Sequence, residues 1–214
     1  MAFRGLNVQI ARYLLEIQAV FLRPDEPFVW ASGIKSPIYT DNRLTLTAVQ
    51  VREHVEQGLA QTIREYFPQA QAVMGTATAG IAHAAITAHL LNLPMGYVRS
   101  SAKSHGRNNQ IEGRLEPGAK VVVVEDLIST AGSVADVVAT LRESGADVVG
   151  VVSIFTYGMA AAAQRFAELG LECHSLTDFD TVIQVAAAEG YIQETDVARL
   201  RAFRDNPADE SWIR

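Results

Sequence analysis

Two adjacent carboxylates, Glu125 and Asp126, follow a run of valines and precede a loop of small and hydroxylated residues. Carboxylates accept hydrogen bonds from sugar hydroxyls and attract metal-bound water, but they repel phosphate. The loop from Ser129 to Ser133 leads into a helix-like segment, and the first N–H groups of a helix can bind an anion. From Asp126 to Thr130 the chain extends at most roughly 13–14 Å, enough to hold a ribose at one end and its phosphate at the other. Ribose 5-phosphate is the ligand that fits.

The loop at 129–133 contains neither the GxxxxGK[ST] pattern of nucleoside triphosphate sites nor the GxGxxG pattern of dinucleotide sites. A different phosphate ligand is therefore expected. On this segment alone a second interpretation stays open, in which the loop is an ordinary strand-to-helix turn with Ser129 or Thr130 as the helix cap.

The elements that must position this segment alternate between strand and helix patterns. The run Val121 to Val124 is continuously β-branched, which is typical of a strand buried on both faces of a parallel sheet. Such alternation predicts an α/β fold with an open, mainly parallel sheet flanked by helices. We predict strands over 72–74, 95–98, 121–124, 148–155 and 173–176, and helices over 7–20, 47–67, 81–91, 132–144, 160–169, 181–188 and 195–203.

The chain of 214 residues shows no repeat, low-complexity tract or linker, so we expect a single domain over 1–214. Residues from about 1 to 45 are expected to form a helix followed by a small hood over the site. The aromatic and β-branched residues from Phe28 to Asn42, interrupted by Ser-Gly and Ser-Pro pairs, predict a hairpin-like element for this hood. Thr47 is expected to cap the helix that follows.

Composition excludes several classes of protein. The formal net charge of −6 argues against nucleic-acid binding, which needs a basic surface. Cys173 is the only cysteine, so no internal disulfide can form, which suits the cytoplasm. The first twenty residues carry three charges and do not resemble a secretory leader. The histidines His54, His83, His89 and His174 show no metal-ligand spacing.

One stretch is long enough to span a membrane, because residues 66–98 contain no Asp, Glu, Lys or Arg. The stretch is rich in Ala, Thr and Gly, however, and it is broken by Gly75, Gly80 and Pro94. We therefore expect a buried strand, helix and strand rather than a membrane helix.

The segment VVVVEDLISTAGS, residues 121–133, resembles the phosphoribosyl pyrophosphate (PRPP) signature of the type I phosphoribosyltransferases. That signature is a hydrophobic strand, Asp-Asp and a Thr-Thr-Gly-like loop. Here Glu125 replaces the first Asp, Ser129 stands at a usual Thr position, and Ala131 takes a position often held by Gly. These departures conserve charge and size.

Three further stretches are similar to orotate phosphoribosyltransferases in particular. They are FVWASGIKSPIYTDNR from Phe28, GTATAGIAHA from Gly75 and YVRSSAKSHGRNNQIEG from Tyr97, and the NPADESWI ending adds to them. Together they cover nearly the whole chain in the family's order. The resemblance implies transfer of ribose-5-phosphate from PRPP to orotate in the synthesis of UMP, with Mg2+ held mainly through PRPP and water rather than by direct protein ligands.

The resemblance also assigns residues to PRPP. Lys103, Glu125 and Asp126 are the catalytic candidates, with the carboxylates on the ribose hydroxyls and Lys103 on the leaving pyrophosphate. The loop over 100–113 is implied to be a lid shared between the subunits of a homodimer. The implied PRPP-binding residues are Arg99, Lys103, His105, Glu125, Asp126, Leu127, Ile128, Ser129, Thr130, Ala131, Gly132 and Ser133.

For orotate, the family pattern points to Ser129, Tyr39 and Lys35, with Arg43 as a substitute for an arginine that some relatives place after the strand ending near Phe155. The segment 75–80 resembles the family's pyrophosphate loop. Lysines that many relatives carry are replaced here by Ala79, just before a glycine of that loop, and by Ala31 in the hood.

Two rival functions can be weighed on the sequence. A purine phosphoribosyltransferase would share residues 125–133 but would need a different hood, and the KSPIYTDNR stretch speaks against it. A regulator that senses PRPP and binds nucleic acid would need a basic surface or an added binding segment, and neither is visible in the sequence.

Overall fold

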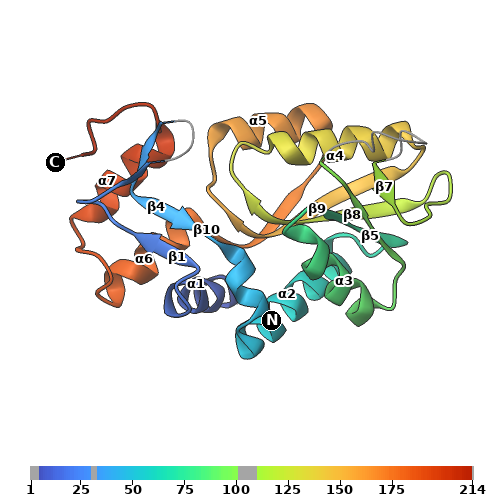
Figure 1. Cartoon of the computed structure of the whole chain (residues 1–214), viewed down its shortest axis with the longest axis horizontal. Helices are drawn as coiled ribbons and strands as arrows, with labels where there is room; N and C mark the ends of the chain where they lie inside the picture. Colours follow the sequence, from blue (N-terminus) through green and yellow to red (C-terminus); the bar gives the residue numbers. More distant parts are fainter. Residues whose placement is uncertain (1–4, 30–32, 101–109, 214) are drawn as a thin grey trace.

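The computed structural model describes residues 5–29, 33–100 and 110–213. Its centre is a six-stranded sheet in the order β10-β9-β8-β5-β6-β7 (Figure 1). All neighbouring strands are parallel except β6 and β7. The predicted open, mainly parallel sheet is thus confirmed. The strands are β5 (Ala72–Thr76), β6 (Met95–Val98), β7 (Ile111–Glu112), β8 (Lys120–Ile128), β9 (Asp147–Thr156) and β10 (Cys173–Asp178).

Helices cover both faces of the sheet. Helices α4 (Gly132–Glu143) and α5 (Ala160–Leu169) lie on one face, and α2 (Val49–Tyr66) and α3 (Gly80–Leu91) lie on the other (Figure 1). The valines of β8 alternate between two hydrophobic clusters, one against each helix layer, and all four are fully buried. The prediction of a strand buried on both faces is therefore confirmed.

The N-terminal segment with α1 (Leu6–Glu16) and the C-terminal helices lie together at one end of the sheet, beside β10 (Figure 1). Strand β1 (Val20–Leu22) pairs with β4 (Ile38–Thr40), and β2 (Phe28–Val29) pairs with β3 (Lys35–Ser36), both antiparallel. The expected hairpin is thus present. The 3-10 helix η1 (Asn42–Leu46) follows it, and α1 (Leu6–Glu16), α6 (Phe179–Ala188) and α7 (Asp196–Asp205) pack around these strands. We call residues 20–46 the hood.

The structure corrects three local predictions. The first helix ends at Glu16 rather than near residue 20, because Gln18 adopts a left-handed conformation and β1 begins shortly after it. Thr47 does not cap α2; the cap position is Ala48, and the Thr47 hydroxyl donates to the carbonyl of Leu44. β8 does not end with the valines but runs to Ile128, because β9 pairs with it along that whole length.

The charge-free stretch 66–98 forms β5, α3 and β6, as predicted. No helix in the described ranges has both the length and the apolar character that crossing a bilayer requires.

The C-terminal part of the chain is tied to the hood by one buried cation, Arg199 of α7, which is 9% exposed. Its guanidinium donates to the Trp212 carbonyl at 2.9 Å and to the Pro24 carbonyl at 2.8 Å. It also contacts the carboxylates of Asp25 and Asp196, at 2.8 and 2.7 Å. A single side chain thus joins α7, the segment after it and the connection between β1 and β2.

We predict that Arg199→Ala lowers the free energy of unfolding by about 3–5 kcal/mol, because it leaves the buried Asp196 carboxylate without its cation. Arg201→Ala, on the same helix, is the matched control. Arg201 pairs with Asp180 but its side chain is 46% exposed, so its loss should cost less than about 1 kcal/mol. Urea unfolding of both variants measures the difference, and equal small losses would contradict the role given to Arg199.

Candidate active site

The loops that carry the predicted site residues meet at one edge of the sheet. Because β5, β6, β8 and β9 are parallel, their carboxyl ends share that edge, which is where open α/β sheets bind ligands. A cavity of about 120 Å3 lies there, lined by residues at the carboxyl ends of β5 and β6, by Gln110 just before β7 and by helix α4. Its lining residues are Thr76, Ala77, Val98, Arg99, Ser100, Gln110, Ser133, Asp136, Val137 and Thr140.

Glu125 is buried at this edge, with 6% of its surface exposed. Its Oε1 accepts a hydrogen bond from the Thr76 hydroxyl at 2.6 Å and one from the Asp126 N–H at 3.0 Å. Burial, followed by the neighbouring Asp126 carboxyl, raises the pKa of Glu125 to about 8. At neutral pH Glu125 therefore holds a proton for much of the time, whereas Asp126 is only half-buried.

Gly80, the first residue of α3, allows this helix to approach β8 closely. A Cβ at Gly80 would lie 2.5 Å from both the Val124 carbonyl oxygen and the Thr76 hydroxyl, which no side chain tolerates. The expected lysine position, Ala79, is the cap residue of α3. The loop before it contains a cis peptide bond between Ala77 and Thr78. The backbone of residues 76–80 is therefore fitted against the strand that carries Glu125.

The loop at 129–133 is shaped by Ala131, which adopts a left-handed conformation with φ 59° and ψ 22°. This residue is the cap position of α4 and forms no side-chain cap. The interpretation with Ser129 or Thr130 as the cap is therefore wrong. A non-glycine residue in this conformation costs about 1–2 kcal/mol, and such strain is concentrated at functional sites. The turn leaves the first N–H groups of α4 without a side-chain cap, as an anion-binding loop requires.

A cation that sequence analysis missed lies against this loop. Arg165, on α5, donates from Nη1 to the Thr130 carbonyl at 2.9 Å. The same nitrogen lies 3.3 Å from the point where a Cβ on Gly132 would sit. No local signal singles out Arg165, because it follows 35 residues after Thr130 and reads as part of an amphipathic helix.

The hood reaches the same edge through Asn42 and Thr40. The Asn42 side chain, 1% exposed, donates from Nδ2 to the backbone carbonyl of Asp126 at 2.7 Å. The Thr40 hydroxyl lies 3.4 Å from the hydroxyl of Tyr157, a residue directly after β9 whose pKa is raised by burial. Sequence analysis did not select Asn42, because nothing in its local pattern distinguishes it from its neighbours.

Of the residues predicted to contact the base, Ser129 lies half-buried in the loop after β8, whereas Tyr39, Lys35 and Arg43 lie in the hood. Tyr39, on β4, is 44% exposed, and its ring centroid is 5.6 Å from that of Phe28. The Lys35 ammonium lies 2.8 Å from the Glu210 carboxylate. Arg43 donates hydrogen bonds from two nitrogens to the two carboxylate oxygens of Asp41, at 2.6 and 2.8 Å. These bonds lower the pKa of the Asp41 carboxyl. Lys35 and Arg43 are thus engaged within the protein.

Arg99, at the end of β6, lines the edge cavity beside Ser133. Its Nη1 is 3.8 Å from Oε1 of Glu112, too far for a hydrogen bond. Lys103, His105 and Ala31 lie outside the described residues. His83, predicted not to be a metal ligand, is fully buried with its Nδ1 2.6 Å from Glu56. The described parts of the chain bring no three His, Cys, Asp or Glu side chains together as a metal cage.

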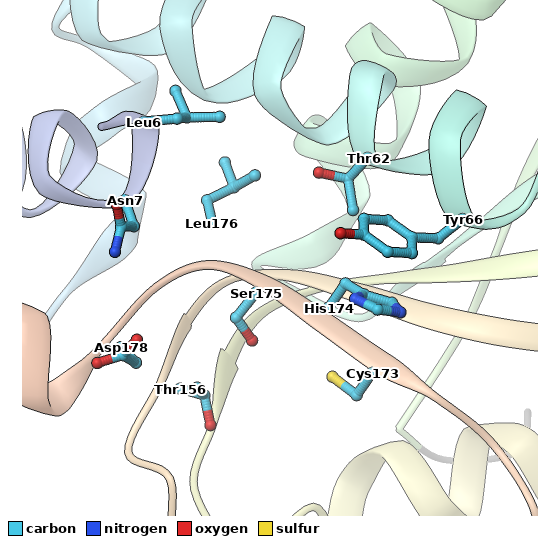
Figure 2. Close-up of a pocket in the computed structure, with 10 residues that line it drawn as sticks. All are labelled: Leu6, Asn7, Thr62, Tyr66, Thr156, Cys173, His174, Ser175, Leu176 and Asp178. Carbon is cyan, nitrogen blue, oxygen red and sulfur yellow. The ribbon is translucent and has the colours of Figure 1, made fainter. Parts of the chain in front are cut away.

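A larger cavity, about 350 Å3, lies along the outer strand β10, away from these loops. Figure 2 shows Tyr66 stacked on His174 at one side of it, with ring centroids 3.7 Å apart. Two of its polar groups have partners within the protein: the Ser175 hydroxyl bonds Ser153, and Asp178 caps α6. The candidate active site is therefore the strand edge and not this cavity.

Comparison with known proteins shows which family the chain belongs to. Residues 46–188 match the family described as the phosphoribosyl transferase domain. The orotate phosphoribosyltransferase of Bacillus subtilis is 54% identical over 205 residues, which are 96% of this chain and 95% of that protein. The chain belongs to the orotate phosphoribosyltransferase family.

Solved structures share the fold of this phosphoribosyltransferase. The crystal structure of orotate phosphoribosyltransferase from Aeropyrum pernix is 30% identical with a TM-score of 0.73, covering 86% of this chain and 99% of that one. The structure of Leishmania donovani UMP synthase gives a TM-score of 0.80 at 26% identity, covering 94% of this chain and 43% of that longer one. The parallel sheet and its flanking helices are therefore those of a type I phosphoribosyltransferase.

In this phosphoribosyltransferase the burial of Glu125 should make stability depend on pH. The pKa of about 8 lies above the ordinary value of 4.5, so the folded protein holds the proton more tightly than the unfolded chain does. The resulting stabilisation is fully present below the unfolded pKa and is lost as pH rises to about 8. Stability of the wild type relative to Glu125→Gln should therefore fall from about pH 5 to about pH 8 and then level off.

Urea unfolding at several pH values measures this difference. Glu116→Gln is the control, because Glu116 is exposed beside Arg114 and its replacement should give a nearly constant difference over the same range. A constant difference for Glu125→Gln as well would contradict the raised pKa.

Proposed function

We propose that this phosphoribosyltransferase transfers ribose-5-phosphate from PRPP to orotate, giving orotidine 5′-monophosphate and pyrophosphate in the synthesis of UMP. The observation that carries the proposal is the 54% identity to the Bacillus subtilis orotate phosphoribosyltransferase over 96% of the chain. That match extends over the hood as well as the PRPP segment, so it includes the side of the site that must distinguish one base from another. We expect the reaction to take place in the cytoplasm.

The reaction replaces one bond at the anomeric carbon of the ribose. The bond to the pyrophosphate oxygen breaks with its electron pair leaving on pyrophosphate, and the orotate ring nitrogen forms the new bond after losing its proton to solvent. No covalent enzyme intermediate is needed. The tasks left to the protein are to orient both reactants, to neutralise the leaving group and to exclude water.

We assign the ribose hydroxyls to Glu125 and Asp126. Since Glu125 is buried with its pKa raised to about 8, the half-buried Asp126 is the carboxyl group of the pair that a ligand reaches more readily. A fixed negative charge beside the ribose stabilises positive charge that develops at the anomeric carbon as pyrophosphate departs. The 5′-phosphate is assigned to the loop at 129–133, where α4 begins after the strained Ala131.

The donor set at this edge fits Mg2+. Glu125 and Asp126 offer oxygen ligands, which Mg2+ prefers, but two carboxylates are too few for a cage made of protein alone. We propose that PRPP and water supply most of the coordination. When bound, Mg2+ supplies neutralisation of charge on the pyrophosphate.

The remaining assignments follow the family resemblance. Tyr39 is proposed as a wall for the flat orotate ring and Ser129 as a contact to it, and Lys35 would have to leave Glu210 to reach the substrate. Arg99, already in the edge cavity, is proposed to face the pyrophosphate. Lys103 and His105 are predicted to act in the neighbouring subunit's site within a homodimer.

The assay that tests this function follows the loss of orotate absorbance with PRPP and Mg2+, with hypoxanthine and adenine in parallel. Orotate alone should be consumed. Asp126→Asn should lower kcat by on the order of a hundred-fold to a thousand-fold, because it removes the charge beside the ribose, and Lys103→Ala should also slow turnover strongly. Asp147→Asn, an exposed residue at the opposite end of the strands, should leave the rate unchanged.

Turnover of a purine would move the assignment to the purine enzymes of the same fold. Absence of turnover with every base, despite binding of PRPP, would contradict an enzyme and favour a PRPP sensor.

Asn42 should act as a positioning residue, because it joins the hood to the backbone of Asp126. Asn42→Asp keeps the shape but loses the N–H donor at neutral pH. We expect the orotate KM to rise by about ten-fold, corresponding to one buried carbonyl left without its donor. Lowering the pH should partly restore the KM in Asn42→Asp, since a protonated carboxyl donates again, but not in Asn42→Ala. Identical pH profiles for the two variants would contradict this role.

A further inference from the structure

Two arginines connect α4 and α5 at opposite ends. Arg142, in the last turn of α4, donates from Nη2 to the Leu169 carbonyl at the end of α5, at 3.0 Å. Arg165, on α5, donates from Nη1 to the Thr130 carbonyl just before α4, at 2.9 Å. Each pairs one guanidinium with one backbone carbonyl. If both were only clamps between helices, they would be equivalent.

Their surroundings differ, however. The carbonyl that Arg165 contacts belongs to the loop proposed to hold the 5′-phosphate, and Nη1 of Arg165 lies 3.3 Å from the position of a Cβ on Gly132. The guanidinium therefore lies against the backbone that opens α4. The carbonyl that Arg142 contacts closes α5, far along the helices from that loop.

Arg165 also has N–H donors without a hydrogen-bond partner among the described residues. A guanidinium has five N–H donors, and within the described residues Arg165 shows one bond, to Thr130, and no ion pair. Other cations named near this edge have a carboxylate close by: Lys35 has Glu210, and Arg43 has Asp41. Arg165 is half-buried, which lessens the screening of its charge by water.

The loop itself supplies no cationic side chain, since residues 129–133 are Ser, Thr, Ala, Gly and Ser. Its backbone N–H groups and the start of α4 offer only about half a positive charge to a phosphate that carries close to two negative charges. Guanidinium is the side chain best matched to phosphate oxygens, because its planar donors can bind two of them together.

We propose that Arg165 is a further binding residue for the 5′-phosphate common to PRPP and the nucleotide product. It holds the Thr130 carbonyl with one N–H and offers the others to the phosphate oxygens, thus bringing charge from α5 to a loop that lacks it. This inference rests on the proposed function, since it takes the loop at 129–133 as the phosphate site.

Calorimetric titration of the full-length protein with ribose 5-phosphate, and separately with pyrophosphate, tests the role without a base or turnover. Arg165→Gln should weaken ribose 5-phosphate binding about ten-fold to a hundred-fold, as loss of a charged hydrogen bond implies, and change pyrophosphate binding less than about two-fold. Arg165→Lys, which keeps the charge, should lose less. Arg142→Gln removes the matching bridge at the other end and should leave both affinities unchanged.

Wild-type affinity for ribose 5-phosphate in Arg165→Gln would overturn the inference. Equal losses for ribose 5-phosphate and pyrophosphate would also overturn it, because they indicate a general disturbance of α4. Because neither titration contains orotate, a failure of the orotate assay with the ribose 5-phosphate result intact would reject the base assignment and leave Arg165 in its role.

Discussion

The hydrogen bond from Thr76 to the buried Glu125 is the contact on which the candidate site depends. It joins β5 to β8 at the edge where both strands deliver their loops, and it is possible only because Gly80 lets α3 begin against the Val124 carbonyl. A larger residue at Gly80 would push the helix away and separate the two loops. The site is thus assembled around a partly protonated carboxyl whose burial is set by backbone packing rather than by a paired cation.

Around this contact, the backbone and the side chains have different roles in the candidate site. The turn at Ala131 directs the start of α4 outward, whereas the sheet fixes Glu125 and Asp126 in neighbouring positions of one strand. Asn42 then closes the hood onto that strand through the carbonyl of Asp126. Since this bond uses the backbone of Asp126, the carboxylate stays available for a ligand. The hood and the proposed ribose-binding side of the site thus both involve Asp126, one through its backbone and the other through its carboxyl.

Much of this arrangement could be predicted from the sequence, because local patterns encode it. The continuous valines predict a strand buried on both faces. The order of strands and helices predicts a parallel sheet whose loops meet at one edge. Strand β7 was missed because two residues carry no periodicity, and the early end of α1 depends on a left-handed Gln18 that no pattern announces. The strained Ala131 was also hidden, since alanine seldom adopts that conformation.

Asn42 and Arg165 were missed for a different reason. Each reaches the site from an element distant in sequence, and its own segment explains it equally well as an ordinary hood or helix residue. Only the packing of the hood on β8, and of α5 beside α4, brings them to the ligand edge. The family resemblance points to the segments that carry the candidate site, but contacts between those segments had to come from the structure.

The buried Arg199 has a consequence for the order in which the protein is completed. Pro24 and Asp25 are synthesised long before Arg199 and Trp212. The guanidinium of Arg199 nevertheless provides the hydrogen bonds that connect Pro24 and Asp25 to the C-terminal segment. The connection between β1 and β2 therefore lacks this anchor until Arg199 has been synthesised. The hood, although encoded near the start of the chain, gains this contact only when the last helix has been made.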